Sequence, residues 1–124
     1  MEFKDIIEKY IKIFIMVLQV ASDRTGNSVY KDVESIIGNS FLVKKSIEEE
    51  RPIPEIITYM ISCIITRVHG NDVYGIEGQD HLNRMIEDLY VRYLKGPTNA
   101  FLKKNGLPVI NSLNETGYLT IYKK

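Results

Sequence analysis

Apolar residues recur at helical spacing along the amino-terminal part of the chain. Polar side chains over residues 2–21 fall three, four or seven positions apart, which leaves a wide apolar face on the other side of a helix. From Ile11 to Ala21 the segment is apolar nearly all round, and its β-branched residues would also suit a strand. Because the polar stripe continues to Gln19, we predict one helix over 2–21, which lies centrally in the core or is covered by a second subunit.

Two shorter helices are expected next. Residues 23–28 read as a polar turn, and the apolar positions that follow predict a helix over 28–37 that Gly38 ends. Asn39 or Ser40 is a suitable cap for a helix over 41–50. The apolar run at its start would also fit a short strand, so the strand alternative stays open for this segment.

Prolines mark the start of the next helix. The acidic residues 48–50 are interpreted as a solvated turn before Pro52, which breaks the chain. Pro54 suits the first turn of a helix over 54–69, where apolar residues again repeat at helical spacing. With the first helix, this segment is expected to form the centre of the core.

Capping residues place two further helices. Asp80 is a good cap for a helix over 80–95, and Gly96–Pro97 has the chemistry that ends one. Thr98 is expected to cap a short helix over 98–104.

The period of the pattern changes near the carboxyl terminus. Val109–Ile110 and Tyr118–Tyr122 are apolar runs on either side of the turn residues 114–117, which is typical of a β-hairpin. We place this hairpin at 108–123. The predicted fold class is therefore α+β: a bundle-like core of four to five helices with a small C-terminal β-hairpin, in a single domain over 1–124.

Composition narrows the range of partners and compartments. The 124 residues, of which 44% are hydrophobic, suffice for one domain with its own core. Sixteen basic and 16 acidic residues give no net charge, so nucleic acid is not the expected partner. The single cysteine, Cys63, lies in an apolar run and is expected as a small buried hydrophobe. The sequence shows no signal-peptide pattern and no stretch long enough for a membrane span, so we expect a cytoplasmic protein.

Two histidines and two aspartates come closest to a chemical site. His69, Asp72, Asp80 and His81 border the expected loop at 71–79, and imidazole and carboxylate suit several divalent ions. Their spacing matches no established ligand pattern, and capping and helix-dipole roles account for Asp80 and His69. Nucleophile elbows, phosphate-binding loops and dinucleotide fingerprints are missing from the sequence. We therefore expect no enzyme, no catalytic residue, no cofactor and no metal.

A non-catalytic regulatory or protein-interaction module is the function that these observations favour, and we expect it to be a homodimer. The first helix is more apolar than a peripheral helix of a small domain needs to be, and a terminal hairpin offers an edge for strand addition. The residues expected at the interface are Ile11, Phe14, Ile15, Leu18, Tyr118 and Ile121.

Two alternatives stay open. A helical sensor could hold a small apolar ligand in its core, because aromatic and methionine side chains gather on the apolar faces. A winged-helix-like DNA-binding regulator could use residues 98–124, with the hairpin as the wing. The expected tip of that hairpin carries Glu115 and no basic residue, which counts against DNA binding.

Overall fold

The computed structural model describes residues 2–25, 32–69 and 76–116, and the regular structure in these ranges is entirely helical. The elements in chain order are α1 (Phe3–Thr25), α2 (Val33–Gly38), α3 (Phe41–Glu48), α4 (Ile53–His69), α5 (Ile76–Leu89), the π-helical turn η3 (Tyr90–Leu94), α6 (Lys95–Lys104) and α7 (Leu113–Thr116). The expected helices over 2–21, 41–50 and 54–69 are confirmed within a few residues at their ends.

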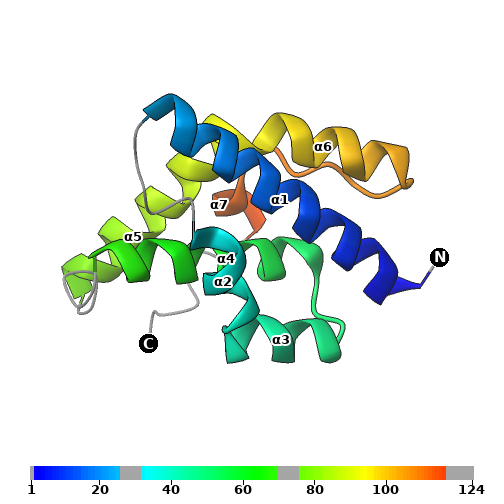
Figure 1. The fold of residues 1–124 in the computed structure, drawn as a ribbon, viewed down its shortest axis with the longest axis horizontal. Helices are drawn as coiled ribbons and strands as arrows, with labels where there is room; N and C mark the ends of the chain where they lie inside the picture. Colours follow the sequence, from blue (N-terminus) through cyan, green and yellow to red (C-terminus); the bar gives the residue numbers. More distant parts are fainter. Residues whose placement is uncertain (1, 26–31, 70–75, 117–124) are drawn as a thin grey trace.

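The helices are arranged around α4. This helix packs against α2, α3, α5 and α7, while α1 packs against α6 and η3 on one side and approaches α2 and α3 on the other. α1 and α6 lie side by side along one edge of the molecule, and α3 lies at the opposite edge (Figure 1). A shallow region between α1, α2 and α3 is thereby left at the surface.

One hydrophobic cluster joins these elements. α1 contributes Tyr10, Phe14 and Leu18, whose side chains are fully buried, and α4 contributes a stripe of isoleucines with Met60. The spacing of these residues is the helical repeat, so each helix presents one continuous apolar face to the other. Met16, on the far side of α1, is 58% exposed, so the apolar character of this helix continues around to solvent.

The expected hairpin, and with it the α+β fold class, is wrong. Residues 107–112 follow an irregular path and α7 is a single helical turn; the expected second strand lies outside the described residues. In a strand, the backbone N–H and C=O groups of Ile110 would form hydrogen bonds with a neighbouring strand. Here two side chains form these hydrogen bonds instead. Asn99 Oδ1 accepts the Ile110 N–H at 2.8 Å, and the Tyr90 hydroxyl donates to the Ile110 carbonyl at 2.5 Å. Ile110 is therefore held against the helices, and its side chain is buried in their core.

The helix expected to end at Gly96–Pro97 continues into α6, so the predicted break there is also wrong. Pro97 lacks an N–H, and its ring crowds the carbonyl four residues earlier. Immediately before it, η3 widens the helix, and the Lys95 N–H bonds the Tyr90 carbonyl five positions back. This π-helical turn accommodates the proline, and the axis changes direction between α5 and α6 (Figure 1).

The expected caps give mixed results. Ser40 caps α3, because its Oγ accepts the Val43 N–H at 3.2 Å. Asp80 is not a cap, since α5 already begins at Ile76. Thr98 is not a cap either, because it lies within α6 and is completely buried. The expected helix over 28–37 appears as α2, which starts at Val33; residues 28–31 lie outside the described ranges.

Candidate functional site

α1, α2 and α3 together form a groove with an apolar floor. Its cavity volume is about 370 Å³. The apolar side chains that line it are Ile11 and Ile15 of α1, Ile37 of α2, and Val43 and Ile47 of α3. Ile11, Ile15 and Ile47 are half-buried, so part of their apolar surface faces solvent. The groove exists because α2 and α3 are short and cover α1 incompletely.

Charged side chains surround this apolar floor. Glu8 and Lys12 stand on α1, Glu34 on α2 and Lys44 on α3, and all of them are exposed. Within the described part of the chain none of them belongs to an ion pair. The rim therefore carries equal positive and negative charge, and its charged groups are available to a partner.

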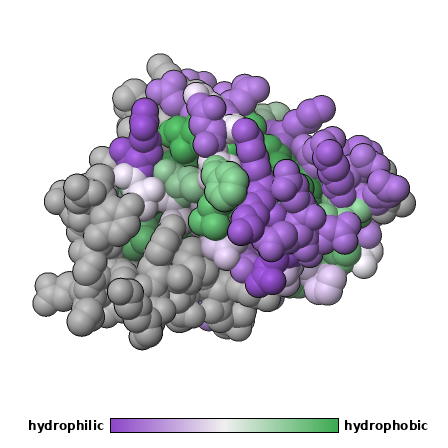
Figure 2. Space-filling model, turned by 90° about the horizontal axis from the view of Figure 1, so that it is seen from below, coloured by the Kyte–Doolittle hydropathy of each residue, from purple (hydrophilic) through white to green (hydrophobic). Residues whose placement is uncertain are grey.

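Phe41 is a large apolar residue at the surface of α3. It is the first residue of α3 and is 77% exposed, while its neighbour Leu42 is 38% exposed. Figure 2 looks onto the face that carries α3 and shows apolar surface beside hydrophilic side chains. Residues three apart on a helix are neighbours, so Phe41 lies next to Lys44 on the rim. α3 thus carries an exposed aromatic side chain one helical turn from a charged residue that lines the groove.

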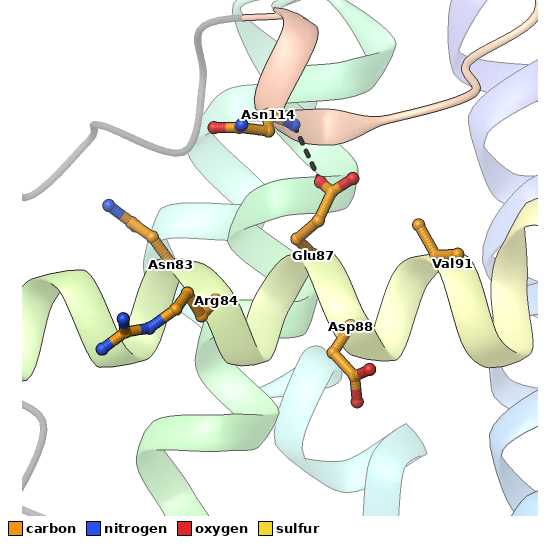
Figure 3. A pocket seen from close by; sticks show the side chains of 6 residues that line it. All are labelled: Asn83, Arg84, Glu87, Asp88, Val91 and Asn114. Carbon is orange, nitrogen blue, oxygen red and sulfur yellow. Dashed lines mark hydrogen bonds between the residues drawn. The ribbon is translucent and has the colours of Figure 1, made fainter.

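A second concavity lies where α7 meets α5 (Figure 3). Its cavity volume is about 390 Å³, and it is lined by Asn83, Arg84, Glu87, Asp88, Val91 and Asn114. The Glu87 carboxylate accepts hydrogen bonds from the Ser112 hydroxyl at 2.5 Å and from the Asn114 N–H at 2.8 Å. Arg92 donates to Asp88 at 3.2 Å. Both carboxylates are thus engaged, and we interpret this pocket as the joint that holds α7 on α5.

A third polar cluster ties the start of α4 to the preceding turn. Arg51 donates to both carboxylate oxygens of Glu55, at 2.8 and 3.1 Å, and the Tyr59 hydroxyl donates at 2.7 Å. Glu55 is buried, and burial raises the pKa of its carboxyl. The hydrogen bonds from Arg51 and Tyr59 outweigh this effect, so the pKa lies below its ordinary value. All three donor groups satisfy one carboxylate, which is a structural arrangement rather than a proton-transfer site.

Cys63 has the properties of a thiol with low nucleophilic reactivity. It is half-buried on α4, and its Sγ lies 3.1 Å from the Ser40 Oγ. Burial raises the pKa of the thiol, and the hydrogen bond with Ser40 only partly offsets this. A raised pKa lowers the thiolate fraction that nucleophilic chemistry requires.

The residues expected at the interface differ in whether the structure leaves them at the surface. Ile11 and Ile15 line the groove, whereas Phe14 and Leu18 are fully buried in the chain's own core and offer no surface to a partner. Tyr118 and Ile121 lie outside the described residues. Phe41 was not among the expected interface residues; it is exposed because it does not share the helical stripe of Val43 and Ile47.

Of the four metal candidates, only His81 has its side chain among the described residues. His81 is an exposed residue of α5, and Asp72 lies outside the described residues. His69 ends α4 and Asp80 lies within α5, but their side chains are not among those described. The described side chains contain no group of three or more histidines, cysteines and carboxylates that could hold a metal ion.

Comparison with protein-family models, with curated proteins and with solved structures finds no match to the chain. In the described ranges no helix combines the length and the apolar character that crossing a bilayer requires. The case for a function therefore comes from the geometry of the surface.

Proposed function

We propose that this chain is a non-catalytic protein-interaction module that forms a homodimer through the groove between α1, α2 and α3. The observation that carries the proposal is the floor of the groove, where Ile11, Ile15 and Ile47 keep apolar surface open to solvent beside two further core residues. Burying such surface against a partner removes it from water at a gain of roughly 25 cal/mol per Å².

The charges on the rim favour a second copy as the partner. A two-fold interface brings the same patch together from both protomers, so the patch must complement itself. Glu8 and Glu34 balance Lys12 and Lys44, so a symmetric pairing can set acids opposite bases. A partner with a strongly acidic or basic surface would leave half of these charges facing like charge, which disfavours association.

The arrangement also resembles the anatomy of known kinds of interface. Specific interfaces have an apolar centre and a polar rim that stays accessible to solvent. The groove has both features, and Phe41 adds an aromatic residue of the type that is enriched at interface centres. The wing expected for a DNA-binding regulator finds no support in the described part of residues 98–124, and the charge of the groove rim is balanced.

Charge reversal tests the proposal without disturbing the core. The double variant Lys12→Glu/Lys44→Glu makes the rim wholly acidic, and both residues are exposed, so the fold should persist. Sedimentation equilibrium should show a dimer for the wild type and a monomer for this variant. The matched control Lys103→Glu/Lys104→Glu makes the same change of charge at the exposed end of α6 and should remain a dimer.

A monomeric wild type at high micromolar concentration would overturn the proposal. A dimer that the rim variant and the control leave equally intact would place the interface elsewhere on the molecule and would also overturn it.

A further inference from the structure

We infer that Phe41 is the anchor of the dimer: each protomer inserts its Phe41 into the groove of the other, between α1, α2 and α3. This inference rests on the proposed homodimer and adds the residue and the pocket that hold it together. A single exposed apolar side chain is ordinary on a protein surface. Phe41 is different because it is 77% exposed and lies one helical turn from Lys44, which lines an apolar groove.

Phe41 lies on a helical turn whose backbone is held in place by contacts with the core. Ser40 caps α3 through the Val43 N–H, and the same hydroxyl contacts the Cys63 sulfur of α4 at 3.1 Å. Val43, two residues after Phe41, is 1% exposed and locks the first turn of α3 into the core. An aromatic residue on such a turn loses little conformational freedom when it binds, so less of the gain from burial is lost.

The geometry allows the exchange to be mutual. Phe41 neighbours Lys44, and Lys44 lines the groove, so the exposed ring lies one helical turn from the rim of the hollow. A two-fold axis that passes between them places the Phe41 of each protomer over the groove of the other. The cavity of about 370 Å³ has room for one aromatic ring, and its apolar floor suits a side chain without polar atoms.

Gly38 gives a way to close the groove from within. It is the last residue of α2 and lines the groove, and a Cβ at this position would meet no heavy atom within 4 Å. The variant Gly38→Leu therefore adds a branched side chain at a residue that lines the groove, without a clash at its Cβ. Gly38→Ala is the matched control, because a single methyl group leaves most of the cavity free.

The first set of measurements compares dimer dissociation constants. We expect Phe41→Ser and Gly38→Leu each to raise the dissociation constant by roughly tenfold or more, as loss of an anchor does. Gly38→Ala should stay near the wild type. Val109→Ser truncates another exposed apolar residue far along the chain, and its dimer dissociation constant should also stay near that of the wild type. Helical circular dichroism must be the same for all variants.

The decisive measurement mixes the two defective chains. A Phe41→Ser chain keeps an open groove, and a Gly38→Leu chain keeps its Phe41, so one anchor is restored only when they pair. Native mass spectrometry of the mixture should show the heterodimer well above the 2:1:1 statistical ratio. A statistical ratio would overturn mutual insertion. If Phe41→Ser dimerises as well as the wild type, the anchor is wrong although the homodimer stands; a monomeric wild type removes both.

Discussion

The hydroxyl groups of Tyr10 and Thr98 lie 2.8 Å apart in the core, and this hydrogen bond joins α1 to α6 across 88 residues of sequence. The Tyr10 side chain is fully buried, and its ring also packs against Phe101, with ring centroids 5.7 Å apart. Burial raises the pKa of Tyr10 well above its ordinary value, although the bond with Thr98 lowers it in part. The pair therefore stays neutral, and each hydroxyl depends on the other for its partner.

The losses of stability from removing the two hydroxyls should be less than additive. Tyr10→Phe leaves the Thr98 hydroxyl buried without this partner, and Thr98→Val does the same to Tyr10, so each should lower the free energy of unfolding by about 1–3 kcal/mol. The double variant should be less destabilised than the sum of the two. Urea unfolding of the four proteins measures this coupling, and strictly additive losses would show that the bond contributes nothing specific.

Acid should weaken the start of α4 through Glu55. Its pKa in the folded chain is lowered, so its carboxylate stabilises the fold above the unfolded pKa of about 4.3, and that contribution disappears as pH falls through the folded value. The urea midpoint of the wild type should fall between about pH 6 and pH 3 more steeply than that of Glu55→Gln. Parallel pH profiles for the two proteins would contradict the role given to the Arg51–Glu55–Tyr59 cluster.

Two turns differ in how well their residues suit a positive φ. Glu50, after α3, has φ 52°, whereas Gly106, after α6, has φ 69° and open space around its Cα. Glu50→Gly should raise the free energy of unfolding by up to about 1 kcal/mol, because glycine adopts this conformation without strain. Gly106→Ala should lower it by about 1 kcal/mol for the same reason. Thermal unfolding of both variants tests the pair, and changes of the same sign would contradict it.

Cys63 should react slowly in the folded chain. Burial raises the pKa of its thiol, whereas the thiol pKa in the unfolded chain is about 8.5. The thiolate fraction near pH 8 is therefore smaller in the folded chain than in the unfolded chain. Iodoacetamide alkylation followed by mass spectrometry should be several-fold slower in buffer than in denaturing urea. Equal rates would show an accessible thiol of ordinary acidity.

The long helices could be predicted because their evidence is local. The apolar stripes of α1 and α4 repeat within a few residues, and Ser40 lies directly before the helix that it caps. Burial follows from the same repeat, which is why Cys63 was expected in an apolar setting.

The errors arose where distant side chains decide the local structure. The backbone of Ile110 is satisfied by Asn99 and Tyr90, which lie 11 and 20 residues earlier, so a strand-like apolar run became an irregular segment. Pro97 is accommodated by a π-helical turn, which no pattern in the neighbouring sequence predicts. The groove likewise depends on how α2 and α3 pack on α1, so the sequence indicated Ile11 and Ile15 but could not separate them from the buried Phe14 and Leu18.

Native mass spectrometry of the wild-type chain over a dilution series would show whether the proposed homodimer forms. We expect a species of twice 14.3 kDa at high micromolar concentration that dissociates on dilution and that the acidic-rim variant Lys12→Glu/Lys44→Glu does not form. A chain that stays at 14.3 kDa at every concentration would contradict the proposal.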